Sequence, residues 1–570
     1  MHENKPWLKF YGVIPPSIQY PDKSMYEIFR ESAANFSDYT AYEFMGKRAS
    51  YSKLSAQIDM AAYALAGLGL GRGSVVTLCL PNCPQAIILF YALNKIGAIA
   101  CIIHPLSAPA EIKFFVDDNS SEIAAVLDIF YNKFEQIIEK TKLKKIIIIN
   151  LTDYSEPLQR IMFYLIIGRK IKNPDRKDGR YLLWGNFLKN SGSPEPRGPS
   201  GPSGPDECAV ILYSGGTTGV PKGIMLSNRN FNALGLQIAC QGPIIPGDTI
   251  LSILPMFHGF GLGICIHTFL IKGGRCILMP NFTPESVAVL IRKKKPQYIA
   301  GVPTLFEALL RNKLINRESL KCLKTAYVGG DKLPQNIKER FDKLIKKQGG
   351  KAELLEGYGL TESVTACIVT PGKRYRAGSM GIPLPDILAK VVIPGTCDEA
   401  RAGSDGELCI SGPTVMLGYL NSPEDTDRVL KKHDDGRIWL HTGDICSMDS
   451  DGYFYFKLRM KRIVKVSGIS VSPVQVEEVL AGHPDIALSC VIGIPDEYKM
   501  QVLKAYVVLR DPSEASGKKG EEIIGFCRKS LNKWSVPAEV EFRKFLPLTK
   551  IGKVSYRDLE KENGAGNARF

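Results

Sequence analysis

A strand-like apolar run that leads directly into a glycine- and threonine-rich loop places the strongest constraint on the fold of this chain. Residues 208–214 read CAVILYS, and residues 212–223 read LYSGGTTGVPKG. Glycines allow backbone N–H groups to turn toward an anion, threonine hydroxyls add donors, and Lys222 adds a positive charge. A helical pattern begins near Asn228, and a loop between a strand and a helix lies at the edge of a sheet. The stretch is therefore predicted to hold a phosphate group.

This loop differs from the P-loop of the NTPases. The P-loop requires Gly, four residues, and then Gly-Lys-Ser/Thr. Lys222 follows Pro221 and precedes Gly223, so the spacing does not match. We therefore expect a phosphate site that belongs to a different class of enzyme.

The length and the order of the elements predict an α/β protein of at least two domains. The chain has 570 residues, which is too long for a single hydrophobic core. Helical spacing at 25–36 and 54–70 alternates with strand-like runs at 74–82 and 144–150, which favours a largely parallel sheet. A Gly/Pro-rich run at 193–206 is typical of a flexible connector.

The C-terminal third of the chain has a different pattern. Residues 406–413, 439–449 and 453–459 are expected to be β segments, with a hairpin turn at 450–452. Strand-like residues at 487–510 and a helix at 520–534 follow. We therefore predict a large N-terminal domain of several subdomains over residues 1–457 and a small α+β domain over residues 458–570.

The composition favours a cytoplasmic protein that binds anions. Lys and Arg number 73 against 58 Asp and Glu, a net charge of +15. No nucleic-acid recognition motif accompanies this charge, so small anions or an anionic membrane surface are the expected partners, and nucleic acid is not. The 14 cysteines never form Cys-x-x-Cys, and a zinc site is not expected. The first ten residues lack a signal-peptide pattern, which predicts a reducing compartment with free thiols.

One segment has the composition of a contact with a membrane surface. Residues 158–172 read LQRIMFYLIIGRKIK, an apolar stretch between Arg160 and a basic cluster at 169–172. The sequence contains no run of 18 apolar residues, so a transmembrane helix is not expected. Two readings stay open: a peripheral contact at the inner face of a membrane, or a helix docked on the protein's own body.

Five further motifs follow the glycine loop in a fixed order. They read LPMFHGFG at 254–261, YVGGDKLP at 327–334, EGYGLTES at 356–363, HTGD at 441–444, and LPLTKIGKVSYRD at 546–558. Together with the loop, they resemble the motifs of the AMP-forming adenylating enzymes, the superfamily that includes the acyl-CoA synthetases. The resemblance implies a large adenylating domain and a small, mobile C-terminal domain.

For ATP and Mg²⁺, the resemblance implies a shared phosphate site. The residues expected to close over the β- and γ-phosphates, with Lys222 nearby, are Ser214, Gly215, Gly216, Thr217, Thr218 and Gly219. Thr361 is expected to bind phosphate. Glu362 and Thr217 are expected to hold Mg²⁺, which prefers hard oxygen ligands.

For the nucleoside and for CoA, the resemblance implies further contacts. Around the adenine it places Gly330, Asp331, Tyr358 and Gly359, with Tyr358 stacked on the base; the ribose hydroxyls would be bound by Asp444 and Arg459. In the segment KLRMKRIVKVSGISVSP at 457–473, Lys461 is expected to be the hinge, and Lys465 and Gly468 are expected to face CoA. Leu458 stands where many relatives carry glycine or a polar residue, so the sequence departs from the family pattern next to the expected hinge.

The catalytic residues implied by the resemblance are Lys553, His258, Thr217 and Glu362. Lys553 would stabilise the charge that builds on the α-phosphate and the carboxylate, and His258 would orient the acid. Attack of the acid on the α-phosphorus would give an acyl-adenylate and pyrophosphate. Rotation of the C-terminal domain about Lys461 would then replace Lys553 by the CoA thiol.

The pattern as a whole looks most like that of the long-chain fatty-acid–CoA ligases, so a medium- to long-chain fatty acid is the expected substrate. His258 stands where peptide-synthetase domains carry an aspartate, which argues against amino acids. Three alternatives stay open: a fatty acyl-AMP ligase that loads a carrier protein, an aryl-acid ligase similar to the coumarate ligases, and a catalytically silent nucleotide-binding protein. Loss of Lys553, Glu362 or Asp444 would mark the last of these, and all three residues are present.

Overall fold

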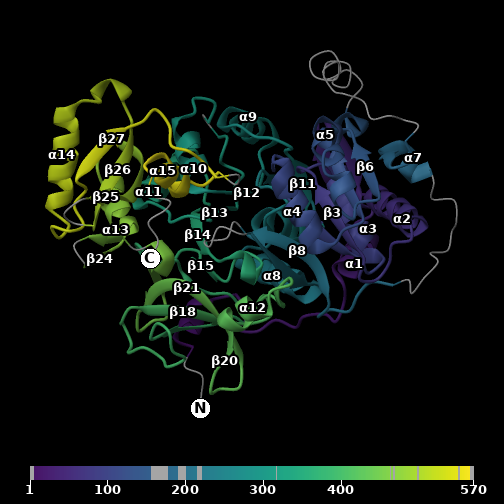
Figure 1. Ribbon diagram of the computed structural model, residues 1–570, viewed down its shortest axis with the longest axis horizontal. Helices are drawn as coiled ribbons and strands as arrows, with labels where there is room; N and C mark the ends of the chain where they lie inside the picture. The colour runs from purple at the N-terminus through teal and green to yellow at the C-terminus, as the bar shows by residue number, and fades with distance from the viewer. Residues whose placement is uncertain are drawn as a thin grey trace.

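The molecule consists of two large sheets with their covering helices, a smaller antiparallel sheet, and a C-terminal unit at one end (Figure 1). This computed structural model describes residues 5–155, 178–189, 201–214, 221–315, 318–462, 464–466, 469–496, 500–549 and 552–564. The proposed membrane segment 158–172 and most of the connector at 193–206 lie outside these ranges. Within them, no helix combines the length and the apolar character that crossing a bilayer requires.

The glycine loop belongs to an eight-stranded sheet with the order β19-β9-β8-β4-β3-β5-β6-β7. Its members are β3 (Val75–Cys79), β4 (Ile99–Ile102), β5 (Ile123–Leu127), β6 (Lys145–Ile149), β7 (Tyr181–Leu183), β8 (Cys208–Ser214), β9 (Lys222–Ser227) and β19 (Gly418–Tyr419). The strands from β8 to β7 are parallel, and β5 and β6 are apolar and buried almost throughout, as expected for strands covered on both faces.

The second large sheet has nine strands in the order β16-β15-β14-β13-β12-β10-β11-β1-β2. They are β1 (Thr40–Phe44), β2 (Lys47–Ser50), β10 (Thr249–Ser252), β11 (Arg275–Leu278), β12 (Tyr298–Gly301), β13 (Thr325–Gly329), β14 (Leu354–Tyr358), β15 (Ile368–Val369) and β16 (Ile382–Pro383). The central strands are parallel, and β2, β15 and β16 are antiparallel at the two edges. These two sheets confirm the predicted α/β fold.

Two smaller antiparallel sheets complete the strand content. One contains β17 (Leu388–Val392), β18 (Gly406–Ser411), β20 (Leu430–Lys432), β21 (Ile438–Met448) and β22 (Phe454–Arg459). The other contains β23 (Val464–Val466), β24 (Ile469–Val471), β25 (Ile486–Asp496), β26 (Met500–Leu509) and β27 (Glu539–Phe542), with β27 parallel to β26. The expected hairpin turn lies between β21 and β22, where Gly452 has a positive φ of 86°.

The α-helices pack on these sheets (Figure 1). They are α1 (Met25–Asn35), α2 (Tyr51–Gly67), α3 (Pro84–Lys95), α4 (Pro109–Asn119), α5 (Tyr131–Glu135), α7 (Trp184–Lys189), α8 (Asn228–Gln241), α9 (Pro284–Lys294), α10 (Pro303–Arg311), α11 (Gln335–Lys347), α12 (Pro423–Val429), α13 (Pro473–Ala481), α14 (Gly517–Arg528) and α15 (Tyr556–Glu562). The predicted helices at 25–36 and 54–70 correspond to α1 and α2. The helix predicted at 520–534 begins earlier and ends earlier, as α14.

Short helical segments connect the larger elements. The 3-10 helices are η1 (Pro6–Phe10), η2 (Asp128–Phe130), η3 (Ile138–Lys140), η4 (Leu151–Tyr154), η7 (Thr361–Ser363), η8 (Met460–Arg462) and η9 (Pro512–Glu514), and η6 (Phe260–Thr268) is a π-helix. All nine residues of η6 are buried, as expected of a helix without a polar face. Gly261 is required where η6 begins, because a Cβ there would stand 2.1 Å from the carbonyl oxygen of Pro255.

The main hydrophobic core joins the two large sheets. Helices α3 and α8 are buried along nearly their whole length, and their residues belong to one apolar cluster with residues of both sheets. Dispersion and the hydrophobic effect over this shared core hold the two sheets as one body. The C-terminal sheet has a separate apolar cluster that contains residues of α13 and α14.

The strand order corrects one local expectation. The glycine loop was predicted to run from its strand directly into the helix near Asn228, but β9 lies between them. Ser214 and Lys222 are partners in the antiparallel β8–β9 ladder, and so are Leu212 and Ile224. The short apolar run Ile224, Met225 and Leu226 within KGIMLS at 222–227 is the signal that identifies β9. Strands β8 and β9 are therefore an antiparallel pair, and α8 begins only after β9.

Several polar pairs join the described residues of the C-terminal unit to the large body. Arg510 Nη1 lies 2.9 Å from Glu307 Oε1, and Asn336 Nδ2 donates to the Ala481 carbonyl at 3.1 Å. Lys332 forms an ion pair with Glu478. Strand β22 runs past residue 457 and remains in the antiparallel sheet, so the first segment outside that sheet is η8, at 460–462. The domain limit at 457/458 therefore stays a prediction.

Candidate active site

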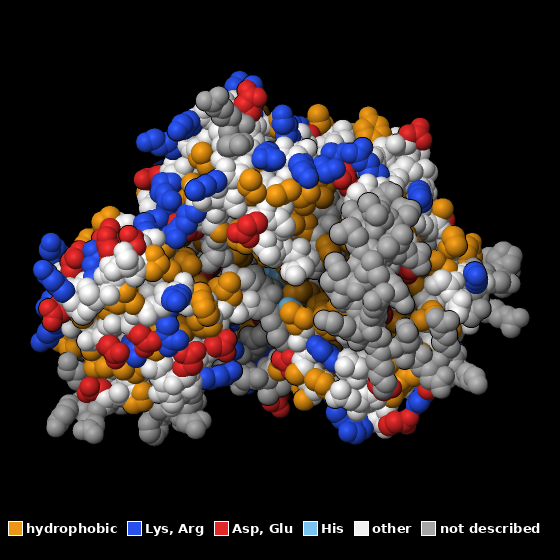
Figure 2. Space-filling model, turned by 90° about the horizontal axis from the view of Figure 1, so that it is seen from above, with side chains coloured by type: hydrophobic (Ala, Val, Ile, Leu, Met, Phe, Trp, Pro, Cys, Tyr) orange, Lys and Arg blue, Asp and Glu red, His pale blue; other side chains and the backbone are white. Residues whose placement is uncertain are grey.

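A cavity of about 960 Å³ opens between the carboxyl ends of β13 and β14, the antiparallel sheet and the C-terminal unit. Figure 2 shows the surface hollowed where the C-terminal unit meets the rest of the molecule. The predicted site residues that line this cavity are Lys222, His258, Gly330, Asp331, Tyr358, Gly359, Thr361, Glu362, Asp444, Arg459 and Lys553. Residues from six separate motifs thus converge on one site.

A carboxylate on β21 anchors one wall of the cavity. Asp444 is 4% exposed; its Oδ2 accepts a hydrogen bond from Tyr358 Oη at 2.8 Å, and its Oδ1 accepts from Arg459 Nε at 2.8 Å. Asp444 and Arg459 face each other across the β21–β22 ladder. Burial and the Asp444 charge raise the pKa of Tyr358 far above its usual range, so the phenol remains a donor. The three side chains form a preorganised hydrogen-bonding set.

Lys553 reaches the cavity from a tight loop just before α15. The Thr549 N–H donates to the Lys553 carbonyl at 2.6 Å, and the Lys553 N–H donates to Thr549 Oγ1 at 3.1 Å. Gly552 has a φ of 82°, and its carbonyl accepts from Thr304 Oγ1 on α10 at 3.1 Å. This last contact ties the C-terminal loop to the large body and directs the lysine into the site.

Burial and neighbouring charges shift the pKa of the Lys553 ammonium in opposite directions, with a net lowering. Burial lowers the pKa of Lys553, and the Arg459 charge lowers it further, whereas Asp331 and Asp444 raise it. The Lys553 side chain lies on Gly330, because a Cβ on that glycine would stand 2.8 Å from Lys553 Cε. Gly330 and Asp331, which are expected at the adenine, both lie beside Lys553.

His258 lies at the start of the π-helical segment. Its Nδ1 accepts from the Phe260 N–H at 3.2 Å, which leaves Nε2 to carry the ring proton. Burial, together with the Lys553 charge, lowers the pKa of His258 to about 3. The imidazole is therefore neutral at pH 7 and can donate a hydrogen bond to an acidic group.

The motif around Glu362 is held by residues that sequence reasoning did not identify. Tyr419 Oη donates to Glu362 Oε1 at 2.9 Å, and Lys222 Nζ lies 4.9 Å above the Tyr419 ring. Gly359 must be a glycine, because a Cβ there would stand 1.6 Å from the Thr365 carbonyl oxygen. Tyr419 comes from β19, almost 60 positions after the motif, so no local pattern could have revealed the pairing.

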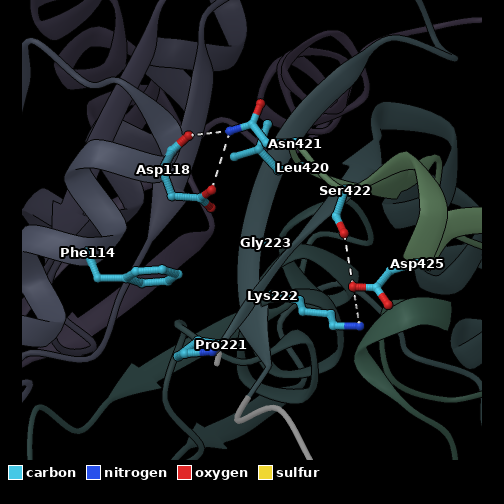
Figure 3. A pocket seen from close by; sticks show the side chains of 9 residues that line it. All are labelled: Phe114, Asp118, Pro221, Lys222, Gly223, Leu420, Asn421, Ser422 and Asp425. Carbon is cyan, nitrogen blue, oxygen red and sulfur yellow. Dashed lines mark hydrogen bonds and ion pairs between the residues drawn. The ribbon is translucent and has the colours of Figure 1, made fainter. Parts of the chain in front are cut away.

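Lys222 forms an ion pair in a smaller cavity beside the phosphate loop (Figure 3). This cavity of about 430 Å³ shares Pro221, Lys222 and Asp425 with the larger one. Lys222 Nζ lies 2.6 Å from Asp425 Oδ2, which also accepts from Ser422 Oγ at 2.9 Å. Asp425 is a second residue that sequence analysis missed. An anion bound at Lys222 would compete with this carboxylate.

The tip of the phosphate loop and the CoA-facing segment are not among the described residues. Outside them lie Gly215, Gly216, Thr217, Thr218, Gly219 and Gly468, and the side chains of Ser214, Lys461 and Lys465. The two ends of the loop are fixed by the pairing of Ser214 with Lys222. Glu362, with its hard oxygen donors, lines the same cavity as Lys222. The residues that are described therefore fit a Mg²⁺ site next to bound phosphates.

One buried acid in the cavity was also not predicted. Glu356 on β14 is 7% exposed, and its Oε1 accepts from the Leu333 N–H at 3.1 Å. Burial raises its pKa from 4.5 to about 7, while the Leu333 hydrogen bond opposes the shift. The glutamate precedes the predicted Tyr358 by two residues, and its burial depends on tertiary packing.

Part of the cavity lining is apolar. Its lining includes Ile238 on α8, Phe260 and Ile264 on η6, Tyr327 on β13, and then Ala366, Val369 and Met380. None of these seven side chains is charged. Such a surface suits a hydrocarbon chain more than a charged one.

Two family models match this chain. The AMP-binding enzyme model covers residues 29–420, and the AMP-binding enzyme C-terminal domain model covers residues 475–553. The chain belongs to the AMP-binding enzyme family. Long-chain-fatty-acid--CoA ligases of Escherichia coli O157:H7 and Bacillus subtilis are 33% and 34% identical to it, over 98% and 99% of both chains. A probable 4-coumarate--CoA ligase 1 of Dictyostelium discoideum is 29% identical over 89% of both chains.

Solved structures of AMP-binding enzymes share the fold. An anthranilate CoA ligase with bound anthranoyl-AMP has a TM-score of 0.81 at 23% identity, with 97% of this chain and 98% of that one aligned. An ATP-bound RpMatB-BxBclM chimera has a TM-score of 0.82 at 24% identity, with 96% and 100% aligned. These findings confirm the resemblance to AMP-forming acyl-CoA synthetases and the enzyme class, an AMP-forming acid–thiol ligase.

Proposed function

We propose that this protein activates a medium- to long-chain fatty acid in two steps at one site. The acid and ATP would give acyl-AMP and pyrophosphate, and CoA would then displace AMP to give acyl-CoA. The observation that carries the proposal is the convergence of Lys553, the Asp444–Tyr358–Arg459 set and His258 on a cavity that also has apolar lining residues.

In the first step, an acid oxygen attacks the α-phosphorus and the bond to pyrophosphate breaks. Lys553 would stabilise the developing charge on the α-phosphate, and His258 would hold the carboxylate through Nε2–H. Asp444 has two oxygens that can accept from the ribose hydroxyls. Mg²⁺, held by Glu362 and Thr217, would neutralise phosphate charge when bound. No protein nucleophile takes part in this reaction.

Charge balance gives Lys222 a distinct role in the first step. In the described residues its ammonium pairs with Asp425, whose pKa is lowered mainly by that contact. Phosphate oxygens that entered the loop would offer Lys222 a stronger partner than a single carboxylate. The ion pair with Asp425 would then hold the lysine again after pyrophosphate leaves.

The second step needs the CoA sulfur at the acyl carbon, where Lys553 also points. Both groups cannot occupy this position together. The C-terminal unit is joined to the large body by the polar contacts named above, which suit a unit that rotates between steps. We propose Lys461 as the hinge, and Lys465 and Gly468 as residues that approach CoA after the rotation.

The proposed acid is a fatty acid because of two independent observations. The cavity has apolar lining residues such as Ile238, Phe260 and Ile264. The first relatives that match nearly the full chain are named long-chain-fatty-acid--CoA ligases. AMP release should be measured with a series of saturated acids of increasing length, with ATP, Mg²⁺ and CoA. We expect the specificity constant to rise with chain length up to medium or long chains. A preference for acetate or for an aryl acid would overturn the assignment of the acid.

The acceptor thiol is tested separately. After acyl-AMP has formed, the enzyme is given either free CoA or a carrier protein that bears phosphopantetheine, and the thioester is quantified. We expect transfer to CoA. Transfer only to the carrier would identify the protein as an acyl-AMP ligase of a carrier-loading pathway, and transfer of coumarate in preference to fatty acids would favour the aryl-acid alternative.

The composition of residues 158–172 supports a further proposal, that a cytoplasmic enzyme reaches fatty acids at a membrane surface. An apolar stretch with a basic end binds anionic lipid through both burial and charge. Sedimentation with vesicles of phosphatidylglycerol and phosphatidylcholine tests it. We expect binding to anionic vesicles that weakens with salt and is lost when Arg169, Lys170 and Lys172 are replaced by Ser. Equal pelleting of that variant would reject the segment.

A further inference from the structure

A cluster of metal-ligating side chains lies in the antiparallel sheet, outside the catalytic residues. The Cys397 sulfur, one ring nitrogen of His433 and one of His441 all lie within 4.8 Å of one another. Cys397 follows β17, His433 follows β20, and His441 lies on β21. His433 is 4% exposed and His441 is 6% exposed. The fold thus brings together three metal-ligating side chains, one thiol and two imidazoles, that no sequence spacing had indicated.

The hydrogen bonds of the two histidines orient their lone pairs. Glu407 Oε2 lies 2.9 Å from His441 Nδ1, so this nitrogen carries the proton and His441 Nε2 carries a lone pair. His433 Nε2 lies 3.0 Å from His441 Nε2 and must then donate to it. The remaining nitrogen, His433 Nδ1, is buried and has no hydrogen-bond partner among the described residues.

We propose that Cys397, His433 and His441 bind a Zn²⁺ ion. A thiolate and two imidazoles are typical zinc ligands, and a fourth position would be open to water. Two nitrogens that each lie about 2.0–2.1 Å from a tetrahedral ion are roughly 3.3 Å apart. The two Nε2 atoms are already 3.0 Å apart. The ion would replace the hydrogen bond between them, with the His433 ring proton moved to Nδ1, and a small separation of the rings makes room for it. Glu407 would act as the carboxylate that orients a metal-binding histidine.

The charges around the cluster are compatible with a divalent cation. The lysines nearest to His433, Lys390 and Lys431, oppose a cation there. The Lys390 ammonium lies over the Trp439 ring at 4.4 Å and 3.6 Å from Glu399 Oε1, which offsets part of its charge. A Cys397 thiolate and Glu407 would supply two negative charges, equal to the charge of the ion.

Two other clusters are weaker candidates. Glu407, Cys409 and His441 also lie close together, but burial raises the pKa of the fully buried Cys409 thiol well above its usual value, which disfavours the thiolate. In the third cluster, Asp485 and Glu522 already accept from Lys519 at the C-terminal unit. In the Cys397 cluster the thiol is half-exposed, and Glu407 already orients the His441 ring.

The proposed zinc site is connected to the catalytic cavity through Glu407. Glu407 Oε1 accepts from the Gly443 N–H at 3.0 Å, and Gly443 precedes Asp444 in β21. An ion that holds His441 would therefore restrict the strand that positions the ribose-binding carboxylate. This connection predicts that zinc stabilises the folded protein and does not itself enter the reaction.

Cobalt replaces zinc as a visible probe of this site. The full-length protein is treated with a chelator and titrated with Co²⁺. We expect one equivalent to bind with the absorption of tetrahedral cobalt and a thiolate-to-cobalt charge-transfer band, and Zn²⁺ to displace it. Cys397→Ser should remove the charge-transfer band, and Glu407→Gln should weaken binding by about 10–100-fold. Cys322→Ser, at an exposed thiol elsewhere, is the matched control and should bind like the parent protein.

The outcomes separate a metal site from a hydrogen-bonded histidine pair. A charge-transfer band that persists in Cys397→Ser, or octahedral cobalt without such a band in the parent protein, would overturn the proposal. Cys397 is half-exposed in a turn, so its replacement by Ser should leave the thermal unfolding of the metal-free protein unchanged. His433→Gln provides a second test if that variant keeps the circular dichroism of the parent. Zinc should raise the unfolding temperature of the parent and of neither variant.

Discussion

The side chain of Lys553 lies directly on Gly330, so that a methyl group at position 330 would stand 2.8 Å from Lys553 Cε and 3.4 Å from Nζ. The glycine also has a φ of 87°, a conformation that costs an L-residue roughly 1–2 kcal/mol. Gly330→Ala should displace the lysine and slow adenylation at least ~10-fold, because small misplacements of a catalytic group are costly. Fatty acid-dependent pyrophosphate release measures this step.

A matched control for Gly330→Ala separates backbone strain from displacement of the lysine. Gly349 has a φ of 80°, but a Cβ there would meet nothing within 4 Å. Gly349→Ala should therefore lower stability by a similar amount and leave pyrophosphate release unchanged. If both variants lost adenylation equally, contact with Lys553 would not be the cause.

Replacing Lys553 itself should separate the two half-reactions. We expect Lys553→Ala to lower pyrophosphate release from acid and ATP by more than ~100-fold, since it removes the positive charge near the α-phosphate. Thioester formation from supplied acyl-AMP and CoA should be retained, because the lysine has left the site in that step. Lys561→Ala on the exposed face of α15 is the control. Normal adenylation in Lys553→Ala would show that another cation performs this role.

The ion pair between Arg510 and Glu307 should bias the protein toward the orientation that places Lys553 in the cavity. Arg510→Ala removes one of the polar contacts across the junction, a pair worth up to about 1 kcal/mol. We expect adenylation to fall about two- to fivefold and thioester formation to remain equal or increase. Lys519→Ala is the matched control, because the carboxylates paired with Lys519 belong to the C-terminal unit itself.

The sequence carries most of the information about the parallel sheets and the motifs. Runs such as IAAVL and KIIII predict buried strands because every residue is apolar, and each motif keeps its chemistry within a few neighbouring positions. The pairing of Ser214 with Lys222 was not predicted, because strand β9 follows the glycine-rich loop directly and its first residues were assigned to the loop.

Pairings between distant segments could not be predicted from one chain. Tyr419 supports Glu362, Asp425 neutralises Lys222, and each contact depends on the fold bringing β19 and α12 beside the earlier strands. Neither Tyr419 nor Asp425 lies in a motif with a phosphate signature. The cluster of Cys397, His433 and His441 could not be predicted for the same reason, because these residues have no zinc-ligand spacing along the sequence and meet only in the folded sheet.

The buried carboxyl of Glu356 should make stability depend on pH. Its pKa is raised from 4.5 to about 7, so between these values the folded protein keeps a proton that the unfolded chain has released. The free energy of unfolding should therefore fall as pH rises through this window, by roughly 3 kcal/mol in total. Glu356→Gln keeps an acceptor for the Leu333 N–H and cannot ionise. Urea unfolding at pH 5 and pH 8 should show a smaller decrease for this variant than for the parent.

Exposed glutamates provide the comparison for Glu356. Glu285, in the first turn of α9, is exposed, and Glu285→Gln should retain the full decrease in unfolding free energy between pH 5 and pH 8. If Glu356→Gln and Glu285→Gln showed the same pH dependence, the proton would be held elsewhere. The result is independent of the identity of the acid substrate.

The apolar end of the cavity should set the length of the acyl chain. Ile238 on α8 lines it and is 1% exposed, so Ile238→Trp would fill space that a long chain needs. We expect the specificity constant for long-chain acids to fall at least ~10-fold, whereas that for short acids remains near the parent value. Overpacking of this kind costs about 1–3 kcal/mol of stability, so the thermal unfolding of the variant is measured first. Because short acids report on the same folded protein, an equal loss for both acid classes would place the acyl chain in another part of the cavity.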